Sequence, residues 1–110
     1  KNTNNSYGAL SDERLKENIT DATPKLDDLM KVKVRNFNMI GDEQKQIGVV
    51  AQELEDVFPS MIINAKTPDS EDETLYKSVK YSVFVPMLIK SIQELTAKVE
   101  MLEKKCQCKN

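Results

Sequence analysis

Apolar residues near the C-terminal end of the chain recur at alternating intervals of four and three residues over residues 81–106. The repeat, which we call the heptad stripe, consists of Tyr81, Val85, Leu88, Ile92, Leu95, Val99, Leu102 and Cys106. This is the a/d pattern of a coiled coil, and it predicts a helix of about 24 residues and about 36 Å. Ser82 is the expected N-cap, and Pro86 lies close enough to the first turn to be tolerated.

A helix of this length extends beyond what one small domain can cover, and charged residues surround its distal half. The heptad stripe therefore favours self-association in a parallel coiled coil. The alternative is an amphipathic helix that packs on its own domain, because any helix of a small fold carries an apolar face. The residue types by themselves favour two strands, since Val and Ile occupy the a positions and Leu the d positions.

The preceding residues predict short, mixed elements. Thr23 is the expected N-cap of a helix with Pro24 at its first position and an apolar face formed by Leu26, Leu29 and Met30. The other predicted elements are a hairpin from residues 32–39 and 47–50, a helix over residues 51–58 that Pro59 ends, and strands at residues 61–63 and 75–81. The expected fold class is α+β, a small mixed helix and strand globular part followed by the long C-terminal helix.

Two segments are predicted to lie outside the packed part. Residues 1–10 are rich in Asn, Ser, Thr and Gly, and they predict a linker from an upstream segment, with the domain itself over residues 11–110. The chain also begins with Lys1 rather than Met, which indicates a piece of a longer polypeptide. Residues 67–73 predict a solvated acidic loop and not a calcium site, because the ligand spacing and central Gly of an EF-hand loop are absent.

Composition narrows the function classes. The net charge is −2, and cationic and anionic residues are interspersed along the chain, which argues against a nucleic-acid partner. The sequence contains no apolar run long enough to span a membrane and no signal peptide, so no membrane partner is expected. Apolar content of 39% with no Trp is low for a self-sufficient globule, which favours an oligomer. Cys106 and Cys108 without any His do not form a zinc site, and we interpret them as free thiols, with interchain disulfides as the alternative. No cofactor and no small-molecule substrate are expected.

The candidate chemistry lies in residues 11–19, which read Ser-Asp-Glu-Arg-Leu-Lys-Glu-Asn-Ile. Ser11 and Lys16 form a possible nucleophile and its general base. A serine hydroxyl needs a group that takes its proton, and a lysine does so when burial or a neighbouring cation lowers its pKa from about 10.4. Judged by spacing alone, the run is a capped helix, with Ser11 as N-cap and the acidic residues in the first turn.

The complete sequence of residues 11–19 resembles that of the endosialidase-type intramolecular chaperones. These form a Ser/Lys peptidase family of self-cleaving domains at the C-terminal ends of phage tail spikes and tail fibres. The resemblance continues through residues 47–54, through Val57-Phe58-Pro59, and through Val79-Lys80-Tyr81-Ser82 into a helix that contains Ile92-Gln93-Glu94-Leu95. The same domain type also occurs in a membrane-bound animal transcription factor. The order and spacing of these pieces make the resemblance specific.

The resemblance implies that Ser11 and Lys16 are catalytic in one self-cleavage event per chain. Attack of Ser11 on the preceding carbonyl forms a five-membered ring, so the favoured scissile bond is Leu10-Ser11. Cleavage at Ser11-Asp12 would require a water molecule or a serine from a neighbouring chain. Glu13, Arg14, Glu17 and Asn18 are candidates to orient Lys16 or the scissile carbonyl, and the sequence assigns none of these roles.

Ser11 and Lys16 do not meet on regular secondary structure. Residues five apart are about 140° apart around a helix, and they lie on opposite faces of a strand. The segment must therefore bend, or the pair must form between chains. We hypothesise that a competent site forms only in the assembled oligomer.

The resemblance implies a homotrimer, and we follow it over the two-strand preference of the heptad stripe. The expected function is an intramolecular chaperone that guides folding of the upstream fibre or spike segment and then releases itself. This would take place in the host cell cytoplasm during virion assembly, and the domain would be released from the mature fibre after cleavage. The alternatives are a trimerisation module that is never cleaved and the auto-cleaving domain of a eukaryotic membrane-bound transcription factor.

Overall fold

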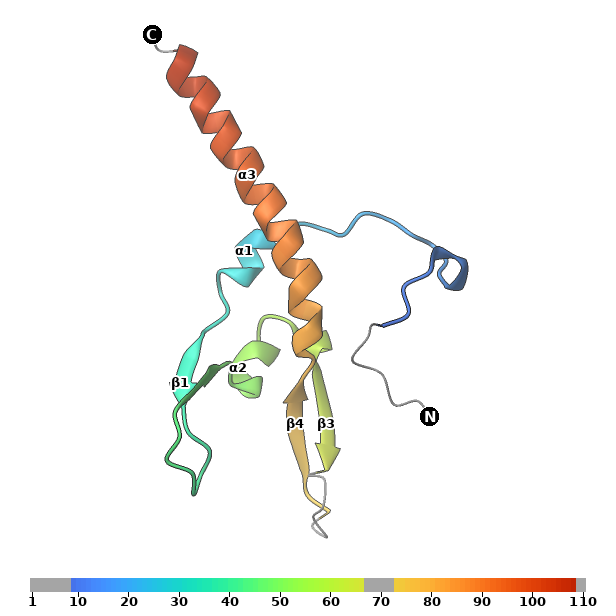
Figure 1. Cartoon of the computed structure of the whole chain (residues 1–110), viewed down its shortest axis with the longest axis vertical. Helices are drawn as coiled ribbons and strands as arrows, with labels where there is room; N and C mark the ends of the chain where they lie inside the picture. Colours follow the sequence, from blue (N-terminus) through green and yellow to red (C-terminus); the bar gives the residue numbers. More distant parts are fainter. Residues whose placement is uncertain (1–8, 67–72, 109–110) are drawn as a thin grey trace.

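The computed structural model describes residues 9–66 and 73–108, with side chains described up to residue 106. Two short hairpins and two short helices form a small body at the lower part of one long helix (Figure 1). The elements in chain order are η2 (Glu13–Leu15), α1 (Leu26–Leu29), β1 (Arg35–Phe37), β2 (Gln46–Gly48), α2 (Ala51–Glu55), η3 (Pro59–Met61), β3 (Ile62–Lys66), β4 (Leu75–Val79), η4 (Tyr81–Val83) and α3 (Phe84–Cys108). The mixed fold class and the long final helix are confirmed.

Each hairpin is an antiparallel pair of strands. Strand β1 pairs with β2, with Arg35 opposite Gly48, and β3 pairs with β4, with Ile62 opposite Val79. Gly41 lies between β1 and β2 at φ 89°, a value that glycine adopts without steric cost. The predicted hairpin is confirmed, with shorter strands. Residues 1–8 of the predicted linker and residues 67–72 of the predicted acidic loop lie outside the described residues.

The core is small. Among the described residues, the buried apolar side chains are Leu54, Phe58 and Met61. Half-buried apolar side chains surround this cluster, namely Leu29, Val32, Val49, Val57, Ile62, Val79, Val83, Phe84 and Met87. Helix α2 supplies Leu54 to this cluster and ends at Glu55, earlier than the predicted end at residue 58, and Pro59 begins the 3-10 turn η3. A core of this size leaves many large apolar side chains of the chain exposed to solvent.

Helix α3 packs on the body through a face other than the heptad stripe. Its contact face consists of Phe84, Met87, Ser91 and Glu94, of which Ser91 is buried and the others are half-buried. The stripe residues follow these positions by one residue, a rotation of about 100° around the helix, and from Tyr81 to Leu102 they are 47–61% exposed. Helix α3 thus packs on its own body mainly through the neighbouring face, while most of the stripe surface is exposed in the single chain.

The start of α1 differs from the prediction. Lys25, not Thr23, occupies the N-cap position and provides no side-chain cap. The Glu94 carboxylate of α3 performs this task, because its Oε2 accepts hydrogen bonds from the backbone N–H groups of Lys25 (2.7 Å) and Leu26 (3.2 Å). A carboxylate at a helix N-terminus satisfies unpaired donors and complements the helix dipole. Glu94 thereby fixes α1 against α3.

The start of α3 also differs from the prediction. Ser82 lies inside the 3-10 turn η4, and the α-helix begins at Phe84 instead of after Ser82. Pro86 is then the third helical residue, where its missing N–H removes no intrahelical hydrogen bond. The helix has 25 residues, which agrees with the expected length.

Gly48 lies at a close approach of two aromatic side chains. A Cβ atom at this position would be 3.0 Å from Tyr81 Oη and 3.2 Å from Phe37 Cε2. The Tyr81 hydroxyl is held there because it accepts a hydrogen bond from the Val49 N–H (3.3 Å). We expect Gly48→Ala to lower the free energy of unfolding by about 1–3 kcal/mol, the usual cost of overpacking, measured by urea denaturation.

The matched control is the same substitution in a Tyr81→Phe background, which removes the nearer of the two atoms. Gly48→Ala should cost less there, and the difference between the two costs gives the coupling energy. Equal costs in both backgrounds would contradict this account of Gly48.

Candidate active site

Ser11 and Lys16 lie in contact within one chain. Lys16 Nζ donates a hydrogen bond to Ser11 Oγ over 2.8 Å. The contact forms because the 3-10 turn η2 lies between two extended residues, Asp12 (ψ 132°) and Lys16 (ψ 153°), so the chain reverses direction. Two backbone hydrogen bonds close the turn, from Leu15 N to Asp12 O (3.0 Å) and from Lys16 N to Glu13 O (3.1 Å). The bend that the sequence required is present, and the contact needs no second chain.

Asp12, and not Ser11, caps the turn. Asp12 Oδ1 accepts hydrogen bonds from the Arg14 backbone N–H (2.9 Å) and from Arg14 Nε (3.1 Å). Asp12 Oδ2 accepts from Arg14 Nη2 (2.7 Å) and Nε (3.2 Å). We call this set of contacts the Asp12–Arg14 clamp. The side-chain hydrogen bonds from Arg14, and then its backbone N–H, lower the pKa of the Asp12 carboxyl.

The sequence gives a partial signal for this clamp. Asp is among the preferred N-cap residues, so Asp12 could have been chosen over Ser11 as the cap. The return of the Arg14 side chain to a residue two positions earlier has no comparable signal, because i and i+2 side chains do not face each other on a helix. Arg14 was a candidate to orient Lys16, and in the structure its guanidinium binds Asp12 instead.

The segment that holds the pair is exposed throughout. Residues 9–24, which we call the arm, carry no buried or half-buried side chain. Figure 1 shows the arm extending to one side of α3 and away from the hairpins. Leu10, Leu15 and Ile19 are 87%, 68% and 68% exposed. The Ser11–Lys16 pair therefore lies in water in the single chain, while a general-base lysine needs an environment that disfavours its charge.

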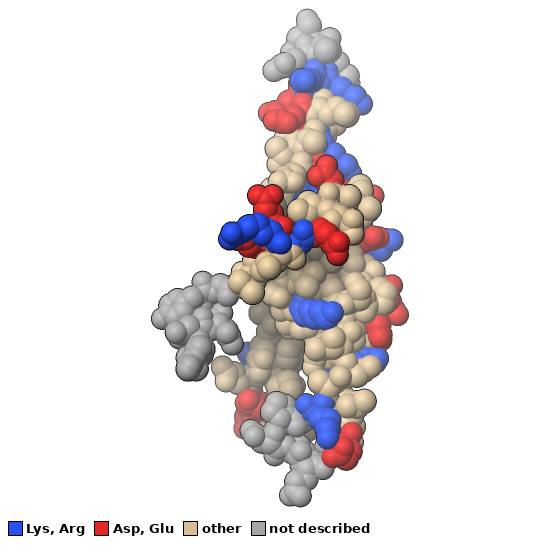
Figure 2. Space-filling model, turned by 90° about the vertical axis from the view of Figure 1, so that its right-hand side faces the viewer, with Lys and Arg blue, Asp and Glu red and all other residues tan. Residues whose placement is uncertain are grey.

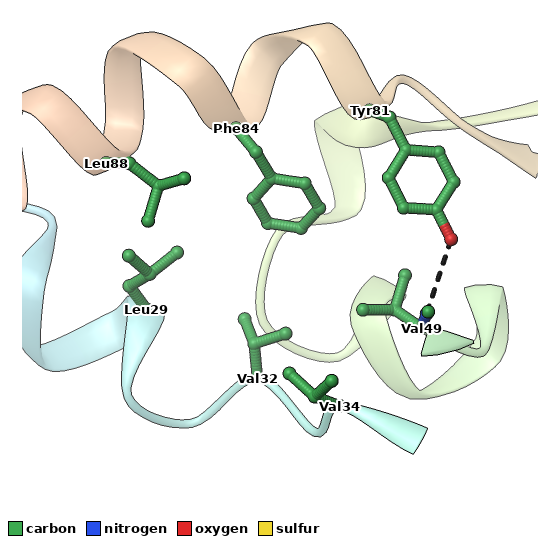
Figure 3. A pocket seen from close by; sticks show the side chains of 8 residues that line it. Leu29, Val32, Val34, Val49, Tyr81, Phe84 and Leu88 are labelled. Carbon is green, nitrogen blue, oxygen red and sulfur yellow. Dashed lines mark hydrogen bonds between the residues drawn. The ribbon is translucent and has the colours of Figure 1, made fainter. Parts of the chain in front are cut away.

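An apolar groove lies elsewhere, between α1, the segment before β1 and the start of α3 (Figure 3). It has a volume of about 290 Å³ and is lined by Leu29, Val32, Val34, Gly48, Val49, Tyr81, Phe84 and Leu88. The Tyr81 hydroxyl is its one titratable side chain and is bonded to the Val49 N–H. The groove contains no nucleophile paired with a base, so the candidate active site is the arm.

Other chemistry receives no support from the described residues. In residues 9–66 and 73–108 no cluster of His, Cys, Asp and Glu suits a metal ion, and no helix has both the length and the apolar character of a membrane span. Cationic and anionic side chains alternate over the face in Figure 2, without a large patch of one sign. Cys106 is a free, exposed thiol. The side chain of Cys108 lies outside the described residues.

The structure combines a mixed helix and strand fold with a Ser11–Lys16 contact on an exposed arm. Residues 11–63 match the model of a family described as "Chaperone of endosialidase", whose family name is that of a serine peptidase. The match begins at Ser11 and ends in β3. Residues 11–63 of the chain thus match the endosialidase chaperone family, which confirms the resemblance seen in the sequence.

A relative extends the similarity beyond the family match. The "Probable tail fiber protein" of Escherichia phage Phieco32 is 36% identical over an alignment of 104 residues that covers 91% of this chain. The aligned part is 14% of the length of that protein. The chain thus spans about one seventh of the relative.

The Asp12–Arg14 clamp generates a pH prediction. Because Arg14 holds the pKa of Asp12 below its usual value, the ion pair is present above that lowered pKa and is lost as the pH falls through it. We expect Arg14→Ala to raise the pKa of Asp12 towards the ordinary 3.8. NMR titration of the Asp12 carboxyl carbon in a Ser11→Ala background measures this, and the Asp21 carboxyl serves as an internal control. An unchanged Asp12 titration would contradict the clamp in solution.

Proposed function

We propose that this chain is a self-cleaving intramolecular chaperone for an upstream phage tail fibre segment of the same polypeptide. The observation that carries the proposal is the 2.8 Å contact between Ser11 Oγ and Lys16 Nζ in a member of a peptidase-named chaperone family. This distance is within the range over which a general base takes a proton. The tail fibre relative supports a fibre segment as cargo over a DNA-binding one.

The proposed cleavage breaks the Leu10-Ser11 bond. Neutral Lys16 Nζ takes the hydroxyl proton as Ser11 Oγ attacks the Leu10 carbonyl carbon, which forms a five-membered ring. The C–N bond then breaks, the Ser11 nitrogen receives a proton from Lys16, and Leu10 remains on Ser11 Oγ as an ester. Water hydrolyses the ester to give a Leu10 carboxylate and a free Ser11 hydroxyl. Cleavage at Ser11-Asp12 is the variant of this proposal that requires a water molecule or a neighbouring serine.

The proposed assembly is a parallel homotrimer joined along the heptad stripe. The support is that the stripe is exposed from Tyr81 to Leu102, while α3 uses a separate face to hold its own body. Residues with a/d spacing and about half their surface in water are expected to pack against other copies. We favour three chains, in line with the resemblance, over the two that the a and d residue types favour. A trimer would also hold three fibre segments in register.

We further propose that assembly activates the site. In the single chain Lys16 and the arm are exposed. A neighbouring chain that covers the arm would exclude water from Lys16 and shield Leu10, Leu15 and Ile19. Desolvation of this kind is the general way to obtain a neutral lysine near physiological pH. Cleavage would then follow correct assembly during virion formation in the host cytoplasm, and release of the domain would make unfolding of the fibre difficult to reverse.

Three substitutions test the chemistry in the full-length polypeptide. Ser11→Ala and Lys16→Ala should abolish cleavage. Lys16→Arg should also abolish it, although it keeps the charge and the hydrogen-bond donors, because arginine remains protonated. Mass spectrometry of the products reads out cleavage and assigns the new terminus to Ser11 or Asp12.

Activity of Lys16→Arg at the wild-type rate would contradict the role of Lys16 as a base. A folded wild-type trimer that is never cleaved would instead identify the chain as a permanent trimerisation module.

Two neighbouring residues of α3 test the assembly. Leu102 belongs to the heptad stripe and Met101 does not, and each is 61% exposed. We expect Leu102→Asp to dissociate the assembly and Met101→Asp to leave it intact, because only Leu102 occupies a d position. Light scattering after size exclusion should give three times the 12.5 kDa of one chain for the wild type and for Met101→Asp.

The same pair of variants tests activation by assembly. Leu102→Asp should cleave at least about tenfold more slowly than Met101→Asp, the effect of about one pKa unit at a base. Cleavage of the monomeric variant at the wild-type rate, independent of dilution, would overturn activation by assembly.

A further inference from the structure

We propose that the Asp12–Arg14 clamp is the positioning element of the self-cleavage site. It holds the turn on which Ser11 and Lys16 meet, and it does so without contacting the scissile carbonyl. The inference rests on the proposed function, since it assigns a role in the same reaction. Asp12 and Arg14 are therefore positioning residues, and Ser11 and Lys16 remain the residues that react.

The clamp lies entirely inside the loop that joins the pair. Asp12 directly follows Ser11, and Arg14 stands two residues before Lys16. One carboxylate binds both the backbone and the side chain of Arg14, with four donor–acceptor distances between 2.7 and 3.2 Å. The backbone contact fixes the start of the 3-10 turn, and the guanidinium contacts fix the orientation of the carboxylate that makes it. Few conformations of the turn satisfy all four contacts.

The arm has little else to hold this geometry. Its side chains are exposed over residues 9–24, so packing against the body does not order it in the single chain. The turn itself is closed by two backbone hydrogen bonds. An isolated 3-10 turn of three residues is marginal in water, because nucleation costs more than one or two hydrogen bonds return. The side-chain clamp therefore decides how often the chain presents Ser11 to Lys16.

The clamp can position Ser11 and Lys16 for cleavage of either bond that flanks Ser11. Leu10-Ser11 and Ser11-Asp12 both lie on the N-terminal side of the Asp12 carboxylate. Neither cleavage removes Asp12 or Arg14 from the segment that carries Lys16. The assignment is thus independent of the position of the scissile bond.

The test is the first-order rate of self-cleavage in the full-length polypeptide. Asp12→Ala removes the cap and the ion pair, and we expect its rate to fall about 5- to 30-fold, which corresponds to about 1–2 kcal/mol, the upper part of the range for losing an N-cap. Asp12→Asn retains an acceptor for the Arg14 N–H and should recover part of the rate. Arg14→Ala retains the cap and loses the ion pair, so it should lie between the wild type and Asp12→Ala. Arg14→Lys should recover less than full activity, because lysine cannot bind the carboxylate through two nitrogens.

Asp21→Ala is the matched control. It removes one negative charge from the same arm, at an exposed residue outside the turn and outside the Asp12–Arg14 contacts. Its cleavage rate should remain within about twofold of the wild type, as is usual for an exposed position. A fall equal to that of Asp12→Ala would show a general charge effect and would overturn the assignment.

Stability separates positioning from a structural role. In a Ser11→Ala background, which blocks cleavage, Asp12→Ala and Arg14→Ala should leave the melting temperature and the oligomeric mass unchanged. Neither side chain packs on the body, and both variants keep Leu10, Leu15 and Ile19, the apolar residues that a neighbouring chain would cover. A lower melting temperature or a lost oligomer would overturn the positioning role. Wild-type rates for Asp12→Ala and Arg14→Ala would overturn the inference and leave the proposed function standing, provided that Ser11→Ala and Lys16→Ala are inactive. Cleavage of Ser11→Ala would instead refute the proposed function itself.

Discussion

The structure depends on how α3 divides its surface between two neighbouring faces. Phe84, Met87 and Ser91 hold the helix to the body of its own chain, while the heptad stripe, one residue further round, remains open. The body has too few apolar residues to cover both faces, since Leu54, Phe58 and Met61 are its buried apolar side chains among the described residues. A single chain therefore orients α3 but leaves the apolar side chains of the heptad stripe exposed to water. Orientation by one face and association by the other is the arrangement expected of a module that joins copies in register.

The Glu94 carboxylate connects this helix to the N-terminal half of the chain. By capping α1 it ties the end of the arm to the middle of α3, in the region where the heptad stripe is exposed. The apolar groove opens beside the same contact, and Leu88 belongs both to its lining and to the stripe. Copies that associate along the stripe would thus meet next to the segment from which the arm departs. In the proposed trimer, this proximity allows one chain to cover the arm of another.

The sequence predicted the elements that depend on neighbouring residues in the chain. It did not predict an element boundary that depends on a residue far away in the chain. Periodicity and turn residues predict the β1–β2 hairpin, two further strands, a helix before Pro59 and the long C-terminal helix, and the structure contains them. The pairing of β3 with β4 is an addition of the structure. The start of α1 was misplaced because Glu94, about seventy residues away in the chain, replaces the local cap that Thr23 was expected to provide. Likewise, the sequence did not identify the second face of α3, formed by Phe84, Met87 and Ser91, which packs on the body of its own chain. Periodicity shows that a face is apolar and does not identify its partner.

For the candidate site, spacing alone required a bend between Ser11 and Lys16 but could not say what makes it. The bend is a capped 3-10 turn within one chain, so the proposed nucleophile and base already lie in contact before the proposed assembly. In the proposed mechanism, contact between Ser11 and Lys16 and exclusion of water from Lys16 are then two separate requirements, met at different times. If contact sufficed for reaction, the domain would leave its cargo before the cargo had folded. A pair that is positioned early and remains in water until a neighbouring chain excludes the solvent can be ready without reacting, because desolvation and not distance then limits the general base. Timing would thus follow from where the arm lies: outside the small core of its own chain, on a surface that only another copy can complete.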